Sequence, residues 1–238
     1  MIREAIDRIL ALGKPEIIDI GEGLDARKFS TGVIHAIKAP MPETLEIQSL
    51  QGLVDYIGFQ KIEASTHALF VHAHDKVALR SVILHPESQR DCQIIAKLDS
   101  ITQQFGQNMS TESFIVWLQS RFCASPERDK VMKLVGNITA GAEVQVQDDG
   151  VTQRATVRAG VTRQEQVDCP NPVNLRPFAT FNEVEQPERP FILRIKTAGK
   201  DEPVMAALHE ADGGAWQVTA RANIAAWLRN KVDIPVIA

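Results

Sequence analysis

Two histidines at alternate positions form the first pattern in the sequence that could do chemistry. His72 and His74 fall in a run of β-forming residues, and alternate side chains of a strand project to one face. Their imidazoles could therefore share a metal ion, with His85 or Asp75 as a further ligand. The histidine and aspartate pattern of a metallohydrolase is not completed downstream, and polar residues are expected where a strand meets its turn. We assign no metal site, and metal-dependent hydrolysis is the third of three hypotheses.

A second group of reactive side chains precedes a glycine turn. His209, Glu210 and Asp212 could supply an acid, a base and a carboxylate. The same residue types also occur at the polar end of many strands. Without a further signature, this group does not define a catalytic site, and we predict a protein that is not an enzyme.

The segment from Gly136 to Gly141 has the glycine spacing of a phosphate-binding loop. Ala142 and Glu143 stand where that loop requires a lysine and a hydroxyl residue, which excludes the match. The cysteines are far apart and match no metal-ligand spacing. Cys123 follows an apolar helical stripe and is expected to be buried rather than nucleophilic. The sequence therefore predicts no cofactor.

Basic side chains on β-rich segments form a candidate binding surface. Arg154 and Arg158 share one face of a predicted strand, and Arg194 belongs to a later strand. These three are the predicted binding residues. A basic face could contact single-stranded DNA, although no aromatic platforms are interleaved with it. The alternative is a solvated face with ordinary cross-strand ion pairs.

Apolar side chains near the C-terminus suggest a contact between subunits. Phe178 and Phe181 lie in a proline-bounded segment, and Ile234 and Ile237 belong to a short apolar tail. Exposed aromatic residues can anchor a subunit interface, so these four are the predicted interface residues. Burial in the core of their own chain is an equally good account of the two phenylalanines.

The helices and strands that would position these residues are predicted from hydrophobic periodicity and from the capping and turn residues at their ends. Helices are predicted from residue 2 to Gly13, after Ser49 and Ser110 as N-caps, after Ser125-Pro126, and over the last apolar-periodic segment to Leu228. Strands are predicted at 17–20, 33–37, 45–47, 68–73, 77–84, 92–98, 142–147, 151–158, 191–196 and 204–209. The Asp149-Gly150 turn between alternating segments specifies a hairpin. Residues 161–167 are polar and are expected to form a loop.

Clusters of helices and strands indicate an α+β fold in which antiparallel hairpins and a mixed sheet are covered by amphipathic helices. We divide the chain into an N-terminal helix with a small β segment at 1–42, an α/β lobe at 43–138, and a hairpin-rich lobe with a C-terminal helix at 139–238. We expect residues 171–228 to form the hydrophobic centre of the fold. In this segment prolines end the extended stretches, and a helix follows a glycine turn.

Composition narrows the class of protein. With 238 residues, 44% hydrophobic and 24% charged, the chain can bury a substantial core. A net charge of −4 gives no general attraction to nucleic acid or to an anionic membrane. The first ten residues mix charges with apolar side chains, unlike a signal peptide, and three scattered cysteines suit a reducing cytoplasm.

The order of elements resembles the uncharacterised YfdQ-like proteins of bacteriophages and prophages. The likeness covers residues 44–230 and is carried by the 50–57 helix, the 68–84 hairpin, the 114–122 helix, the 141–158 hairpin and above all Phe181 to Lys196. These motifs are structural, and no catalytic residues come with them. The resemblance implies a viral protein made in the bacterial cytoplasm.

The leading hypothesis is a non-enzymatic phage accessory protein that forms a homo-oligomer and acts by binding. Its partners would be other copies of itself and a host defence protein or a small signalling ligand, so that it counteracts host defence. The second hypothesis is an accessory factor for phage replication or recombination that contacts single-stranded DNA. Nucleic acid is the less favoured partner, and no membrane partner is expected.

Overall fold

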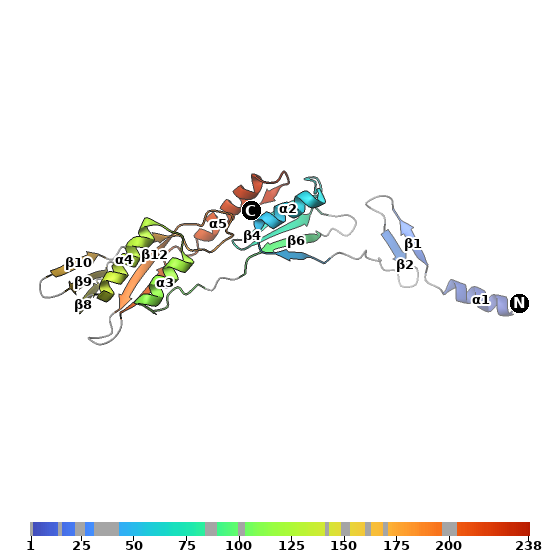
Figure 1. Cartoon of the computed structure of the whole chain (residues 1–238). Coiled ribbons are helices and arrows are strands. Elements are labelled where there is room, and N and C mark those ends of the chain that lie inside the picture. The colour runs from blue at the N-terminus through green and yellow to red at the C-terminus, as the bar shows by residue number, and fades with distance from the viewer. Residues whose placement is uncertain are drawn as a thin grey trace.

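The computed structural model describes residues 2–13, 16–21, 27–30, 43–83, 90–99, 103–140, 143–148, 153–159, 163–168, 171–196 and 204–238. It has an α+β fold with antiparallel hairpins and one mixed sheet, as the sequence predicts. Along the molecule, a helix and a two-stranded sheet are followed by one lobe with a five-stranded sheet and a second lobe with a four-stranded sheet (Figure 1).

The first lobe is built on a mixed five-stranded sheet in the order β14-β4-β5-β6-β3. Its strands are β3 (Leu45–Ile47), β4 (His67–Ala73), β5 (Lys76–Ser81), β6 (Cys92–Lys97) and β14 (Val236–Ile237). The central strands pair antiparallel, whereas β14 and β3 add in parallel at the two edges. Helices α2 (Leu50–Gln60) and α5 (Trp216–Arg229) contribute to its aliphatic core.

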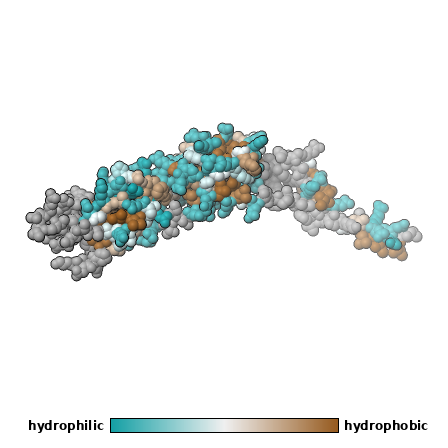
Figure 2. All heavy atoms as spheres, viewed as in Figure 1, coloured by the Kyte–Doolittle hydropathy of each residue, from teal (hydrophilic) through white to brown (hydrophobic). Residues whose placement is uncertain are grey.

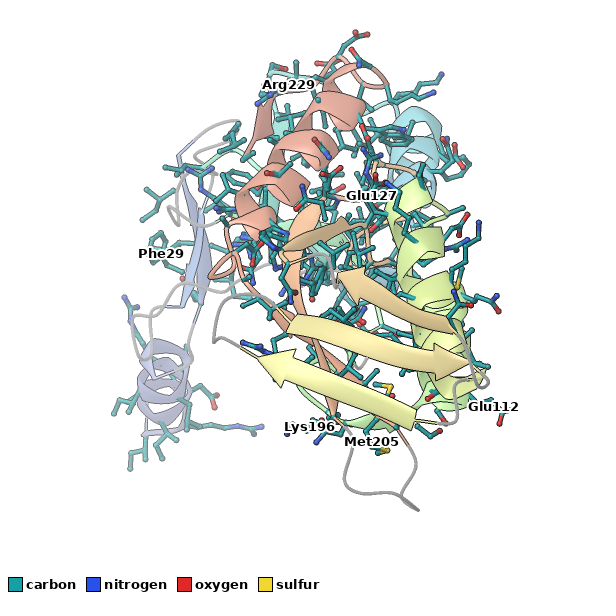
Figure 3. All side chains as sticks on the ribbon, turned by 90° about the vertical axis from the view of Figure 1, so that its left-hand side faces the viewer. Phe29, Glu112, Glu127, Lys196, Met205 and Arg229 are labelled. Carbon is teal, nitrogen blue, oxygen red and sulfur yellow. The ribbon has the colours of Figure 1, made fainter. Side chains whose placement is uncertain are left out.

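The second lobe is built on a four-stranded antiparallel sheet in the order β11-β12-β13-β7. Its strands are β7 (Met109–Ser110), β11 (Val173–Leu175), β12 (Arg189–Lys196) and β13 (Met205–Glu210). Helices α3 (Thr111–Arg121) and α4 (Pro126–Ala140) pack on it around buried Phe114, Trp117, Phe122 and Phe191. Lys196 and Met205, which are register partners, mark one end of this sheet (Figure 3).

Two smaller sheets complete the structure. Helix α1 (Ile2–Leu12) is followed by β1 (Ile17–Ile20), which pairs antiparallel with β2 (Arg27–Ser30). Strands β8 (Glu143–Asp148), β9 (Gln153–Ala159) and β10 (Arg163–Asp168) form an antiparallel sheet. The predicted 33–37 strand and the Asp149-Gly150 turn lie outside the described residues.

The prediction of a loop at 161–167 was wrong, because β10 occupies 163–168 and pairs with β9 along six residues from Arg163 to Asp168. The segment Arg-Gln-Glu-Gln-Val-Asp has few apolar side chains, so it lacks the alternation that marks a strand facing a core. Its place is fixed by backbone pairing with β9, which apolar periodicity does not report.

Serine caps set the starts of three helices, as predicted. The side chains of Ser49 and Ser110 accept hydrogen bonds from Gly52 N and Ser113 N. Ser125 Oγ accepts a hydrogen bond from Arg128 N, and Pro126 is the first residue of α4. Each hydroxyl satisfies a first-turn N–H that has no partner within the helix.

The two cores draw on distant parts of the chain. Helix α5 and β14, from the C-terminus, complete the core of the first lobe, whereas α3 and α4 pack with strands that follow them by several tens of residues. The sequence division at 138/139 therefore does not coincide with the division between the cores. None of the helices in the described residues is long and apolar enough to cross a bilayer.

Candidate functional site

A pocket of about 270 Å³ lies where the two lobes meet. The first lobe contributes His74 and Asp75 from the β4–β5 turn, and the second contributes Arg189 and Glu210 from β12 and β13. We call it the interlobe pocket, and its full lining is His74, Asp75, Leu98, Asp99, Gln103, Phe105, Ala179, Arg189, Glu210 and Trp216.

Hydrogen bonds between distant segments hold the walls of the pocket together. Thr180 Oγ1 donates to the carbonyl of His74 at 2.5 Å, which ties the β4–β5 turn to the segment before β12. Gln103 Nε2 donates to the carbonyl of Phe178 at 2.9 Å. Gly106 has a φ of +75°, and its N–H donates to the carbonyl of Leu208 at 2.7 Å. These contacts tie the segments that line the pocket to one another.

Arg189 is the central residue of the interlobe pocket and is only 1% exposed. Its Nη1 donates to Glu210 Oε1 at 2.5 Å, and its Cζ lies 3.6 Å from the ring centroid of Trp216. Burial lowers the pKa of Arg189, whereas Glu210 and then Asp212 oppose that shift. An arginine guanidinium stays protonated in proteins, so the pocket contains a buried positive charge.

Three buried polar atoms of the pocket have no hydrogen-bond partner in the described part of the chain. They are Nε and Nη2 of Arg189 and Oε1 of Gln103. Most buried polar groups in folded proteins are hydrogen-bonded, and an unpaired one costs about 1–3 kcal/mol. Two free donors and one free acceptor in the lining indicate a place where a ligand can add hydrogen bonds.

Trp216 is fixed at the start of α5 by the turn that precedes it. Asp212 accepts hydrogen bonds from Gly214 N at 3.0 Å and from Trp216 N at 3.1 Å. Gly213 and Gly214 have φ values of +60° and +85°, which glycine adopts without steric strain. The turn therefore holds the indole ring against the guanidinium of Arg189.

His74 forms the other contact to Trp216, with ring centroids 4.6 Å apart in an edge-on arrangement. Burial lowers the pKa of His74 from its usual value of 6.5, Asp75 opposes the shift, and Arg189 reinforces it. This direction favours the neutral imidazole at pH 7. It offers one donor and one acceptor nitrogen rather than a second positive charge.

The structure separates the two histidines that the sequence placed on one face. The β4–β5 register shifts between Val71 and Ala73, so the regular alternation is interrupted there. His72 is exposed and stacks on Phe70, whereas His74 contacts Trp216. Across the described ranges, no three His, Cys, Asp or Glu residues converge as metal ligands. His85 lies outside them.

The predicted group at the end of β13 is divided among three roles. Glu210 pairs with Arg189, and the carboxylate of Asp212 caps the start of α5. His209 is exposed, next to the position where a Cβ on Gly106 would lie. Only Glu210 lines the interlobe pocket, so the three side chains do not form one acid–base site.

The predicted basic residues fall in two different sheets. Arg154 and Arg158 are in β9 of the three-stranded sheet, and Arg194 is in β12 of the four-stranded sheet. The side chains of Arg154 and Arg158 are not among those the structure describes. Arg194 is half-buried on the face of β12 opposite Arg189.

The predicted interface residues have different environments. Phe181 is fully buried and Ile234 is 5% exposed, both in the core of the first lobe. Phe178 is half-buried, and Ile237 is 51% exposed at the edge strand β14. Burial within the chain accounts for Phe181 and Ile234, so neither is available to another subunit.

A larger, more open groove of about 910 Å³ lies beside Cys123 and Arg176. The charge of Arg176 is already paired, because its Nη1 lies 2.9 Å from Glu185 Oε1 and its Nη2 lies 3.3 Å from Glu188 Oε2. Burial raises the pKa of Cys123, which keeps its thiol protonated. Arg176 is thus already paired and Cys123 is not a reactive nucleophile, whereas the smaller pocket contains buried polar atoms without partners among the described residues and is the better candidate.

Sequence reasoning did not name Arg189 among the site residues and missed its burial. The alternation of the strand could have revealed this burial. Arg189 falls on the same face of β12 as Phe191, Leu193 and Ile195, and that face is buried. A cation in register with three apolar residues is expected to be buried with a partner or to contact a ligand. Gln103 and Phe105 carried no comparable signal, since they lie outside regular elements.

No protein-family model matches the sequence, and no curated protein or solved structure shows significant similarity to the chain.

Proposed function

We propose that this chain is a non-enzymatic binding protein that functions as a homo-oligomer. The observation that carries the proposal is the exposed apolar face of α1, where Ile2 is 80%, Ile6 50%, Ile9 68% and Leu10 60% exposed. Apolar side chains lie along one side of the helix and polar ones along the other (Figure 2). A face of this kind needs a partner surface.

The physical chemistry of short elements supports an intermolecular partner for this arm, which we define as α1, β1 and β2. An isolated helix of 11 residues is marginal in water, and a lone two-stranded sheet is equally so. Strand β1 adds exposed Ile17, Ile18 and Ile20. Burial of these side chains against a second copy stabilises both elements.

The charges of α1 favour a second copy over a lipid surface. Its polar positions carry Arg3 and Arg8 together with Glu4 and Asp7, so its side chains have no net charge. Helices that lie on anionic membranes are rich in lysine and arginine on the polar face. A neutral apolar arm is better suited to a symmetric contact with its own copy, which is the commonest mode of oligomerisation.

The biological setting in the proposal is a bacteriophage accessory role in the bacterial cytoplasm. It is supported by the resemblance of residues 44–230 to YfdQ-like proteins. In this role the oligomer counteracts host defence by binding a defence protein or its small signalling ligand. Among the described residues, the interlobe pocket offers a cavity with buried polar groups for a small ligand of this kind.

The test is the mass of the native assembly in solution across micromolar concentrations. The wild type is expected to be oligomeric, and the double variant Ile6→Glu/Ile9→Glu is expected to be monomeric, because charges replace the centre of the apolar face. Ala11→Glu is the matched control, since it adds the same carboxylate to the polar side of α1. A wild type that is strictly monomeric overturns the proposal.

A further inference from the structure

We infer that the interlobe pocket binds a small zwitterion of the free amino acid type. Its carboxylate pairs with the Nε–Nη2 edge of Arg189, and its ammonium group faces Asp75 and Asp99. The inference rests on the proposed function in one respect, namely that the chain acts by binding. It names the ligand class and does not depend on assembly.

The carboxylate half of the assignment follows from the geometry of the guanidinium. Nη1 of Arg189 is already paired with Glu210, which leaves Nε and Nη2 as the two atoms without partners among the described residues. These two N–H groups point in parallel along one edge of the planar group, at the spacing of two carboxylate oxygens. A planar carboxylate therefore completes the hydrogen bonding of Arg189 in one step.

The burial of Arg189 makes this edge a specific recognition element rather than a general cation. The guanidinium is stacked on Trp216, and its Cζ lies 5.9 Å from the ring centroid of Phe105. Its orientation is therefore fixed before a ligand arrives. A fixed donor pair loses little conformational entropy on binding, which favours affinity for a ligand of matching shape.

The ammonium half follows from the charges of the lining. The pocket contains one arginine and three carboxylates, and Glu210 is the partner of Arg189. Asp75 and Asp99 remain as negative side chains of the lining, and Gln103 Oε1 is an acceptor without a partner in the described chain. A ligand with a carboxylate alone would meet two like charges. A positive group on the same molecule complements them.

The size of the pocket sets an upper limit on the ligand. Sites for drug-sized molecules have volumes of about 300–1,000 Å³. At about 270 Å³ the interlobe pocket falls below that range. Phe105, Leu98 and Trp216 supply apolar wall, so the ligand has room for a small side chain beside its two charged groups.

The first experiment measures binding of the twenty free amino acids, one at a time, to the wild-type chain by calorimetry. At least one is expected to bind. For the tightest of them, the corresponding acid without the amine and the amine without the carboxylate are each expected to bind at least roughly 10-fold more weakly, since each loses one charge pair. If no amino acid binds, the inference is overturned. Equal binding of the acid alone also overturns it.

The second experiment uses Arg189→Lys, which keeps the charge beside Glu210 and removes the two-donor edge. Roughly 30-fold weaker binding of the same amino acid is expected, because lysine cannot contact both carboxylate oxygens in this way. Arg176→Lys is the matched control and is expected to leave binding unaltered, since Arg176 is also paired with a carboxylate but lies outside the interlobe pocket. Unchanged affinity in Arg189→Lys contradicts the inference.

The third experiment separates the ligand from the assembly. Asp75→Asn/Asp99→Asn is expected to lose the preference for the amino acid over the acid without its amine, and a retained preference contradicts the ammonium assignment. The monomeric Ile6→Glu/Ile9→Glu chain is expected to bind the amino acid as the wild type does. Failure of assembly and failure of ligand binding are thus read from different variants and different measurements.

Discussion

Helices α1 and α3 have the same length, 11 residues, and both carry apolar side chains at helical spacing, yet they differ in where those side chains lie. Phe114 and Leu118 of α3 are fully buried, whereas Ile2 and Ile9 of α1 are 80% and 68% exposed. Helix α3 covers the four-stranded sheet, and most of its apolar face is accounted for within the chain. The apolar face of α1 is exposed in the described part of the chain, and in our proposal a second copy would cover it.

The difference shows that an amphipathic pattern indicates the need for a partner surface. The pattern does not tell whether that surface belongs to the same chain or to another molecule. In α3 the need is met by α4 and the sheet, which makes this helix part of the folding core. In α1 the same pattern contributes little to the stability of one chain. Substitutions in the two helices should therefore separate folding from assembly.

The largest effect on stability is expected in α3, the buried helix of the two. Leu118→Ala is expected to lower the free energy of unfolding by about 2–5 kcal/mol, because it leaves a cavity among buried side chains. Ile9→Ala in α1 is the matched control and is expected to change it by less than about 0.5 kcal/mol in the monomer. Urea denaturation of both variants in an Ile6→Glu background measures this. Equal losses would show that α1 packs within its own chain.

The next largest effect concerns the junction of the lobes. Glu210→Ala removes the partner of a buried guanidinium and is expected to cost about 1–3 kcal/mol of stability, less than a fully buried pair since Glu210 is partly exposed. Glu188→Ala, which removes an exposed partner of Arg176, is expected to cost less than about 1 kcal/mol. Thermal denaturation of both variants compares a pair whose arginine is buried with a pair at the surface. A similar cost for both would mean that Arg189 gains little from Glu210.

A smaller effect is expected at the start of α4 in the second lobe. Ser125→Ala removes the acceptor for Arg128 N and is expected to cost about 1 kcal/mol. Ser120→Ala is the control, because its hydroxyl donates to the carbonyl of Trp117 within α3 and caps no free N–H. Denaturant midpoints of the two variants measure the difference. No loss in Ser125→Ala would indicate that water replaces the cap.

The smallest effect is a dependence of stability on pH at the pocket. Burial lowers the pKa of His74 below 6.5, so the unfolded chain takes up a proton first as the pH falls. The contribution of neutral His74 is therefore complete above pH 6.5 and declines below it. His74→Gln is expected to weaken the loss of stability between pH 7 and pH 5, as measured by denaturation at each pH. An unchanged pH profile would assign that loss to other groups.

Much of the local structure could be predicted from particular residues. The starts of three helices could be predicted from Ser49, Ser110 and Ser125-Pro126, because capping involves residues only two or three positions apart. The 68–84 hairpin follows from β-rich runs flanking a short polar turn. The site was harder to predict, since the register shift between Val71 and Ala73 interrupts the alternation from which His72 and His74 were expected to share a face. Strand β10 escaped prediction because its side chains carry no apolar alternation.

The sequence by itself determined the class of fold, the starts of the capped helices, and the apolar face that α1 presents. Tertiary structure alone decided that α5 and β14 return to the first sheet and that Arg189 is enclosed beside Trp216 and Glu210. The physical reason is the distance along the sequence over which each interaction acts. Capping and alternation act between neighbours, whereas the pocket depends on contacts such as that between Thr180 and His74, which are 106 residues apart.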